Sequence, residues 1–435
     1  MAPFLIRNIS FICTLIYLFS FTQLFGQKPI SGPFVGSVTD HSAKVWVAYK
    51  DKFSLKITLT DGTNFYDPTL ISESNRKNKK TAIVDFGRLP PSTHFTVLCN
   101  GNPVSNSHTK VQFTTQKTEP DTSQIRFLAA SCALILHKPL AIVFPGASRK
   151  IFKSMYSDST DFMLWMGDNV YLLKYHLKSE KRVFRKNMNV RTKFKSYDKL
   201  LSSQPNYSIW DDHDFGPNNT DNNFEGKNYT TKIFKEMWPN PPLTFPEKGN
   251  FYTFKQGDIQ FFMLDDRTNK NLKNNPKTCL GSDQIEWLKM ELSNSTASFK
   301  FIVNGNQIIK KQRGSECLRY FQEEFNDIFS FIRTNNIDGI VLLSGDVHHT
   351  ELLKDDELGN YPIYELTCSP MTSKLSKAPF EQSQIMKNTL VLNKRNYAIT
   401  TISGDVGNRI LKFDILDKKG KLIWSREIKL IDISN

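Results

Sequence analysis

Residues able to bind metal ions or move protons follow directly after five apolar runs of strand length. The runs are IRFLAA, DFMLWM, NYSIW, IQFFML and GIVLL. After them, in chain order, stand Cys132, Asp168, Asn169, Tyr171, Asp211, Asp212, His213, Asp265, Arg267, Asp346 and His348. Open α/β sheets bind ligands at the carboxyl ends of their strands. We therefore expect these side chains to meet at one rim.

Three of the carboxylates indicate bound cations. Asp168, Asp212 and Asp346 could not all remain ionised in one cleft without strong positive charge nearby. A pair of metal ions supplies that charge. An oxygen-rich ligand set suits a hard ion such as Ca²⁺, Mg²⁺ or Mn²⁺.

Three softer donors indicate an ion of another kind beside it. A Cys132 thiolate, a Tyr171 phenolate and the His348 imidazole suit a transition ion such as iron or zinc. Two ions about 3.5 to 4 Å apart can activate a water and hold the oxygens of a phosphoryl group during in-line displacement. The donor set therefore favours phosphoryl-transfer chemistry.

Several of these residues also have a structural interpretation. Taken alone, Cys132 is most often a buried apolar residue, and Tyr171 could belong to the core. His349 is expected beside His348, and either imidazole could face a metal.

Other polar residues are expected to support the ligands or bind substrate. Asp211 is expected to orient ligands or cap a turn, and Asp265 to fix Arg267 through a salt bridge. Asn219 could bind substrate or shape the GPNN turn. Asn169, directly after Asp168, is placed in the same supporting set.

Two regions with different patterns of apolar and turn residues must position these side chains. Short β-type runs separated by turn residues predict a small antiparallel sandwich over residues 27–118. After a linker, apolar runs alternate with helical patterns over residues 125–435, which predicts an α/β domain. A basic segment from Leu173 to Leu201 is expected to be helical, either as a solvated face or as a rim that attracts polyanions.

The charge of the chain favours anionic partners. Its 435 residues include 57 Lys and Arg against 43 Asp and Glu, a net charge of +14. Such a field steers anions toward a protein. No basic-region helix, zinc-finger spacing or aromatic RNA-binding signature is present, so no specific nucleic-acid binding is expected.

The first 26 residues have the pattern of a signal peptide. Arg7 precedes an apolar run from Ile9 to Phe21 that is short for a membrane span. Cleavage after Gly26 would export the protein to the periplasm or the extracellular space without a transmembrane segment; a retained anchor is the alternative. Among the remaining cysteines, Cys279 and Cys317 could form a disulfide.

Five motifs in one order carry a family resemblance. The series SC, GDNVY, WDDHDFGPNN, LDDR and SGDVHHTE resembles the PhoD-like (alkaline phosphatase D) metallophosphoesterases. SGPFVGSVTDHSAKVWV is similar to the start of that family's N-terminal immunoglobulin-like β-sandwich. The resemblance covers nearly the whole chain after residue 26. It implies an α/β, calcineurin-like four-layer sandwich and hydrolysis of phosphate mono- or diesters.

The resemblance also implies roles for single residues. The implied ligands are Cys132, Tyr171 and His348 for the first metal, Asp168 for both metals, and Asp212 and Asp346 for the second. The implied pair is iron plus calcium or another divalent ion, with a metal-bound hydroxide attacking phosphorus. His213 would contact the phosphate or protonate the leaving oxygen, and Arg267 would clamp a phosphate oxygen. Lys270 departs from the family pattern, which has a second Arg there.

Two alternatives stay open. A purple-acid-type metallophosphatase shares GDxxY but has Asp in place of Cys132 and GHxH in place of GDVH. A non-catalytic exported binder of phosphorylated polymers would not need two metals. The expected partner is a phosphorylated small molecule, a phospholipid or a phosphate-linked polymer, and the protein is expected to be a monomer.

Overall fold

The computed structural model describes residues 28–50, 55–74, 76–103, 110–118, 121–136, 150–311, 314–376 and 383–434. The predicted signal peptide, residues 1–26, lies outside these ranges. Among the described helices, none combines the length and the apolar character that crossing a bilayer requires.

The N-terminal part of the described chain forms two small antiparallel sheets. Their strand orders are β1-β2-β6-β5 and β4-β3-β7-β8. The strands are β1 (Ser31–Gly36), β2 (Ala43–Lys50), β3 (Ile57–Thr60), β4 (Phe65–Tyr66), β5 (Leu70–Glu73), β6 (Lys79–Phe86), β7 (His94–Cys99) and β8 (Gln112–Thr114). Val45 and Val47 pack into the core between the sheets, whereas Trp46 and Ala48 pack into a second core formed with the helices that follow. This alternation follows from the two-residue side-chain period of a strand, and the expected β-sandwich is confirmed.

The first large sheet is part parallel and part antiparallel, with the order β11-β10-β9-β18-β19-β20. Its strands are β9 (Ile125–Ala130), β10 (Phe162–Met166), β11 (Asn206–Ile209), β18 (Asn396–Ser403), β19 (Ile410–Asp417) and β20 (Leu422–Lys429). β9, β10 and β11 run parallel, so their carboxyl ends lie at one edge of the sheet.

The second large sheet has the order β12-β13-β14-β15-β17-β16. Its strands are β12 (Tyr252–Gln256), β13 (Ile259–Met263), β14 (Phe299–Val303), β15 (Ile340–Ser344), β16 (Glu351–Asp355) and β17 (Ile363–Thr367). The four inner strands run parallel, and β12 and β16 pair antiparallel at the two edges.

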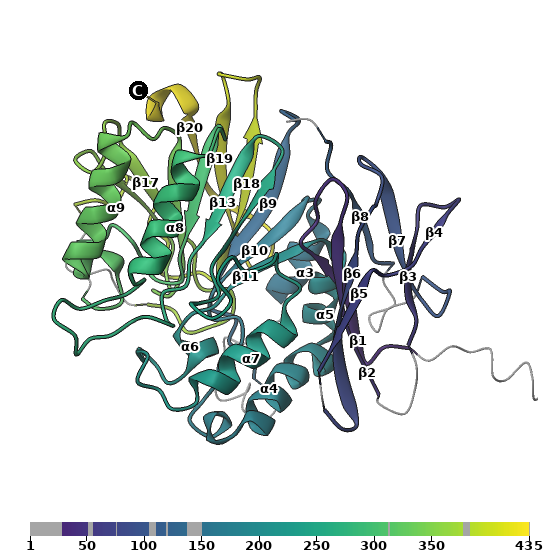
Figure 1. Ribbon diagram of the computed structural model, residues 1–435. Helices are drawn as coiled ribbons and strands as arrows, with labels where there is room; N and C mark the ends of the chain where they lie inside the picture. Colours follow the sequence, from purple (N-terminus) through teal and green to yellow (C-terminus); the bar gives the residue numbers. More distant parts are fainter. Residues whose placement is uncertain are drawn as a thin grey trace, which may run out of the picture.

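Helices flank the two large sheets, which gives four layers (Figure 1). The helices are α3 (Lys150–Ser157), η1 (His176–Lys178), α4 (Glu180–Lys193), α5 (Lys195–Ser203), α6 (Asp212–Phe215), α7 (Lys227–Met237), α8 (Ser282–Ser293), η2 (Leu318–Tyr320), α9 (Gln322–Thr334) and η3 (Leu430–Ile433). Between the sheets the ring of Phe127 lies 5.3 Å from that of Phe261 and 5.7 Å from that of Phe301. The expected four-layer α/β architecture is confirmed.

The basic segment between β10 and β11 joins the N-terminal sheets to the first large sheet. Arg191 of α4 is fully buried, and its guanidinium lies 5.0 Å from the ring of Trp238 and 5.5 Å from that of Trp46. Ser31 of β1 donates a hydrogen bond to Asp198 of α5 at 2.6 Å. The segment is helical as expected, and one of its faces is a packing surface rather than a solvated one.

The predicted disulfide between Cys279 and Cys317 is wrong. Both residues are buried thiols in the described part of the chain. The Sγ of Cys317 lies 3.4 Å from the backbone oxygen of Ile308 and 3.4 Å from that of Lys310, either of which can accept its single proton. The sequence around both cysteines is polar, but the fold places their side chains in the core.

Candidate metal centre

The carboxyl ends of parallel strands from both large sheets converge beside α6 (Figure 1). Cys132 follows β9, Asp168 follows β10 and Asp212 follows β11, whereas Asp346 follows β15 of the other sheet. The Sγ of Cys132 lies 3.6 Å from the backbone oxygen of Asp346, so the two sheets meet at this point. The strand ends therefore deliver their polar residues to one place, as the sequence predicts.

Two glycines permit the close approach of these strand ends. A Cβ on Gly167 would lie 2.6 Å from the Cβ of Asp211, and a Cβ on Gly345 would lie 2.5 Å from the Oγ of Ser131. Real Cβ contacts essentially never fall below 3.0 Å. Any larger residue at Gly167 or Gly345 would push the strand ends apart.

Four candidate ligands have a left-handed backbone. The φ angle is 60° at Cys132, 56° at Asp168, 63° at Asp346 and 61° at His348. Non-glycine residues rarely adopt this conformation, which costs about 1–3 kcal/mol per residue and clusters at functional sites. The surrounding structure holds these side chains in directions that a relaxed backbone would not give.

Two groups of potential ligand atoms share the carboxylate of Asp168. Cys132, Asp168 and His348 each bring one such atom to within 4.8 Å of the others. Asp168, Asp212 and His213 form a second group by the same criterion. One carboxylate thus stands between a group that contains sulfur and a group in which carboxylates predominate.

Tyr171 contacts residues of both groups. Its hydroxyl lies 3.0 Å from Nε2 of His348. Its ring stacks on that of His213 with the centroids 4.2 Å apart. Tyr171, which could have belonged to the core by its sequence, is therefore buried at the centre of the cluster.

Asp346 lies next to the cluster but, among the described residues, belongs to neither group. Its backbone oxygen accepts the hydrogen bond from Cys132. After burial and other charges, its own negative charge contributes to the raised pKa values of Cys132 and Asp168.

Burial and mutual repulsion oppose the ionisation of the cluster. Burial and then the charge of Asp212 raise the pKa of Asp168 well above its ordinary value. Burial and then the charge of Asp168 do the same to the pKa of the Cys132 thiol and of the Tyr171 phenol. Burial lowers the pKa of His348 to about 4. Such a cluster ionises readily only when cations take the place of protons.

Unsatisfied polar atoms fit a pair of cations as well. Among the described residues, Oδ1 of Asp212 and Nδ1 of His213 are buried without a hydrogen-bond partner. Buried polar atoms normally have partners, and these two residues share a ligand group with Asp168. The mixed sulfur, nitrogen and oxygen donors suit a transition ion on one side and a harder ion on the other.

A buried chain of charges supports α6. Asp211 caps the helix, and its side chain accepts a hydrogen bond from the backbone of Asp212. Nε of Arg267 donates to Asp211 at 2.8 Å, and its Nη2 contacts both Asp211 and, at 2.8 Å, Glu316. Nη1 donates to the backbone oxygen of Thr220 at 3.2 Å. All three guanidinium nitrogens are engaged, so Arg267 would have to leave these partners to clamp a phosphate.

The predicted salt bridge between Asp265 and Arg267 is wrong. Asp265 holds the backbone N–H of Arg267 at 3.0 Å and also accepts from Trp210 at 2.8 Å and from the backbone of Asn250 at 2.7 Å. These neutral donors satisfy the carboxylate. The guanidinium pairs instead with Asp211 and Glu316, and its Nε lies 3.6 Å from the carboxylate of Asp266.

The other supporting residues hold the loops together. Asn169 donates to the backbone oxygen of Ile209 at 2.7 Å, which links the ends of β10 and β11. The backbone N–H of Asn219 donates to Asp212 at 2.6 Å. His349 lies 3.2 Å from Glu351, so His348 rather than His349 belongs to the ligand group.

Four residues at or around the centre were not singled out from the sequence. They are Asn304, Asn306, Glu316 and Ser369. Asn304 and Asn306 follow β14, and each has a buried Oδ1 without a partner among the described residues. The strand-end rule could have found these two, because FKFIV leads directly into NGN.

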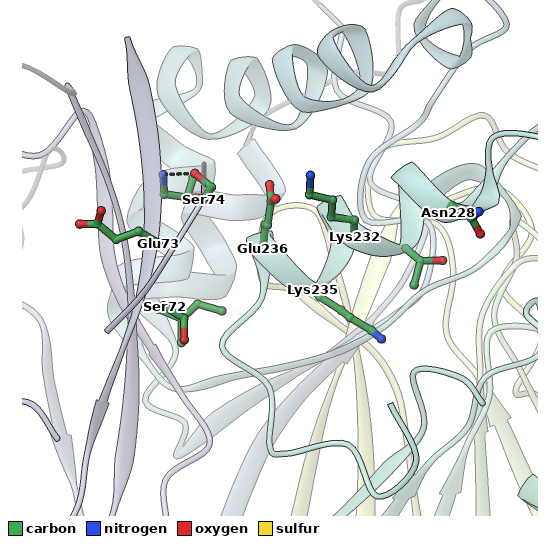
Figure 2. A pocket seen from close by; sticks show the side chains of 10 residues that line it. Ser72, Glu73, Ser74, Asn228, Lys232, Lys235 and Glu236 are labelled. Atoms are coloured by element: carbon green, nitrogen blue, oxygen red, sulfur yellow. Dashed lines mark hydrogen bonds between the residues drawn. The ribbon is translucent and has the colours of Figure 1, made fainter. Parts of the chain in front are cut away.

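A pocket of about 440 Å³ is lined by residues of β5, β6 and α7 (Figure 2). Its lining includes Glu73 of β5 and Lys232 and Glu236 of α7. Lys232 pairs with Glu180 at 3.0 Å, and Glu236 pairs with Arg76 at 2.8 Å. Its lining residues include none of the candidate ligands.

Comparisons with known proteins support one family. The model of the PhoD-like phosphatase family matches residues 127–408. Alkaline phosphatase D of Bacillus subtilis is 21% identical over 249 residues, or 45% of this chain, and the match spans only 42% of that protein.

Two solved structures share the fold. The structure of PhoD has a TM-score of 0.67 at 17% identity and covers 93% of each chain. A purple acid phosphatase from yellow lupin (Lupinus luteus) seeds has a TM-score of 0.65 at 11% identity, over 91% of this chain and 74% of the other. At these identities the likeness concerns the fold alone.

Proposed function

The chain belongs to the PhoD-like phosphatase family, and from this premise we propose that it hydrolyses phosphoric ester bonds at a centre of two metal ions. The observation that carries the proposal is the carboxylate of Asp168, which belongs to two groups of potential ligands at once. A shared carboxylate of this kind suits a bridge between two cations.

The proposed ligands divide by chemistry. They are Cys132, Tyr171, Asp168 and His348 for the first cation, and Asp168, Asp212 and Asp346 for the second. When bound, the two cations would supply a nucleophilic water and positive charge for the phosphoryl oxygens. Thiolate and phenolate donors favour iron at the first position, and carboxylates favour calcium or another divalent ion at the second.

His213 is proposed to act on the substrate. Its backbone N–H donates to Asp168 at 3.2 Å, and its ring stacks on Tyr171, so the imidazole is fixed beside the shared carboxylate. It remains partly exposed. An imidazole in this position can protonate the leaving oxygen or contact the phosphate.

Arg267 is proposed to position α6 rather than to touch the substrate. The sequence predicts a phosphate clamp, but the guanidinium is buried and bound to Asp211, Glu316 and the backbone of Thr220. Asp211 in turn caps the helix that carries Asp212 and His213. The charge of Arg267 also helps to hold the pKa of Asp212 below its ordinary value, although burial alone would raise it.

The proposed substrates and location follow from the charge and the N-terminal residues of the chain. The substrates would be phosphate mono- or diesters in small molecules, phospholipids or phosphate-linked polymers, and the net charge of +14 favours such anions. Residues 1–26 would direct export to the periplasm or beyond. The protein would act as a monomer with domains at 27–118 and 125–435 and without specific nucleic-acid binding.

Metal analysis combined with two chromogenic esters tests the proposal. We expect about two metal ions per chain by mass spectrometry, and release of p-nitrophenol from p-nitrophenyl phosphate or its bis-ester. Chelation should abolish turnover, and metal addition should restore it. Tight binding of phosphorylated polymers without hydrolysis in iron, zinc, calcium or manganese would instead favour a non-catalytic binder.

A further inference from the structure

We infer that Ser369 is a positioning residue for the first cation, because its one hydroxyl fixes the thiolate ligand and the histidine ligand together. The inference rests on the proposed function, since it assumes that Cys132 and His348 bind the same ion. Ser369 is fully buried and lies 237 positions from Cys132 and 21 from His348 in the sequence.

The hydroxyl of Ser369 makes two contacts that use its donor and acceptor capacities separately. Its proton is directed at Sγ of Cys132, with an O–S distance of 3.0 Å. Its oxygen accepts the backbone N–H of His348 at 3.2 Å. A serine hydroxyl has a single proton and two lone pairs, so both contacts can exist at once.

The backbone of Ser369 is itself fixed. Its N–H donates to the hydroxyl of Thr350 at 3.1 Å, and its carbonyl accepts from Nδ2 of Asn396 at 3.3 Å. The backbone that carries the hydroxyl is therefore held in place by these partners. It also braces His348, whose left-handed backbone needs support from its surroundings.

The contact with sulfur gains importance when the thiol loses its proton. As a thiol, Cys132 donates to the backbone oxygen of Asp346 at 3.6 Å. A thiolate has no proton to donate, so the hydrogen bond received from Ser369 remains. Donors around a metal ligand set its orientation and its electron density.

Ser131 provides a matched control within the same site. Its Oγ lies 3.5 Å from Sγ of Cys132, but it also lies 3.0 Å from the backbone oxygen of Cys368. The shorter contact takes its single proton. Ser131 and Ser369 are thus two buried serines beside one sulfur, but Ser369 makes the shorter contact and Ser131 has a nearer acceptor in Cys368.

Cobalt titration of the metal-free protein tests the inference without measuring turnover. Co²⁺ bound to a thiolate shows sulfur-to-metal charge-transfer absorption in the near ultraviolet. In Ser369→Ala we expect this band to move to lower energy, because a thiolate without its hydrogen bond gives up an electron more easily. The affinity for Co²⁺ should fall about tenfold, whereas Ser131→Ala should leave the band in place.

A second pair of variants isolates the hydroxyl if Ser369→Ala does not fold. Ser369→Thr keeps the hydroxyl and Ser369→Val replaces it with a methyl group of nearly the same shape. The Val variant should show the shifted band, and the Thr variant should show the wild-type band. Equal bands and equal affinities in this pair, or equal shifts in the Ser131 and Ser369 alanine variants, would overturn the inference.

Wild-type protein distinguishes failure of the proposed ligand set from failure of the proposed role of Ser369. If wild-type protein binds Co²⁺ without any sulfur absorption, the proposed ligand set fails, and the role of Ser369 fails with it. If wild type shows the band and the Ser369 variants match it, only the role of Ser369 fails.

Discussion

The hydroxyl of Tyr171 lies 3.0 Å from Nε2 of His348, although 177 positions separate the two residues. Tyr171 belongs to the loop after β10 of the first large sheet, and His348 belongs to the loop after β15 of the second. Their contact crosses from one sheet to the other. The candidate centre therefore forms only when the two sheets are packed together.

Asp168→Asn should abolish turnover and metal binding together. The substitution keeps the size of the side chain but removes the charge that both ligand groups share. We expect kcat/KM to fall at least about a thousandfold, which corresponds to about 4 kcal/mol of transition-state stabilisation. Ester hydrolysis and metal content of the same preparation are the measurements.

The matched control for this variant is Asp67→Asn. Asp67 is 72% exposed and pairs with Lys56 at 3.0 Å in the N-terminal part. It should retain both metals and full turnover. An Asp168→Asn protein with near-normal turnover would refute the two-metal proposal.

His213→Ala should separate catalysis from metal binding. If the imidazole acts on the leaving oxygen, its loss should lower kcat by about two to four decades while both metals stay bound. His41→Ala, at a histidine that is 70% exposed, serves as the control. Loss of one metal along with activity would instead make His213 a ligand, which its place in the second group also permits.

The strand-end rule predicts most of the candidate centre from sequence. Cys132, Asp168 and Asp212 each follow a buried strand of the first large sheet, and the parallel order of those strands places them at one edge, where Asp346 arrives from the end of β15 in the second sheet. Hydrophobic runs determine where the strands lie, and the residue after each run is visible in the sequence. The same rule applied to FKFIV would have added Asn304.

Partners within the buried network cannot be read from the sequence in this way. Asp265 stands two positions from Arg267 and is the obvious partner, yet the guanidinium pairs with Glu316, 49 positions away. Ser369 reaches Cys132 across 237 positions. Such pairs depend on how the two sheets and their loops pack, and local sequence patterns do not predict that packing.

Glu316→Gln should destabilise the protein strongly. The carboxylate accepts from Nη2 of Arg267 at 2.8 Å and from Nζ of Lys270 at 2.6 Å, and its side chain is 8% exposed. Without that charge, the buried guanidinium of Arg267 and the buried ammonium group of Lys270 lose the counter-ion that they share. Breaking a buried pair in this way costs about 3–5 kcal/mol, which the midpoint of urea unfolding would report.

A double variant checks that charge is the cause. Adding Lys270→Met to Glu316→Gln removes one of the two positively charged side chains left without this counter-ion, and should recover part of the lost stability. Glu323→Gln on the exposed side of α9 should change stability by less than about 0.5 kcal/mol. A loss below about 1 kcal/mol in Glu316→Gln would show that the network contributes little.

The free energy of unfolding should include a contribution from Lys186, and this contribution should rise with pH in the alkaline range. Lys186 of α4 is 7% exposed, and its Nζ donates to the backbone oxygen of Ile135 at 3.0 Å. Burial lowers its pKa from 10.5 to about 8. Its neighbour His176 is neutral in this range, because burial and then Lys186 lower its pKa to about 4.

The direction of the effect follows from proton counting. Below pH 8 the lysine is charged in both states, and the folded state bears the whole cost of burying that charge. Between pH 8 and 10.5 the folded state releases the proton before the unfolded state does, so this contribution stabilises the fold as pH rises. The shift corresponds to about 3 kcal/mol across the window.

Lys186→Met should therefore be more stable than wild type at pH 7, even after losing one hydrogen bond worth about 1 kcal/mol. Urea unfolding at intervals from pH 7 to 10 should show that difference shrinking, whereas Lys181→Met, exposed on the same helix, should follow wild type throughout. Parallel stability curves for wild type and Lys186→Met would mean that Lys186 reaches water in the folded state.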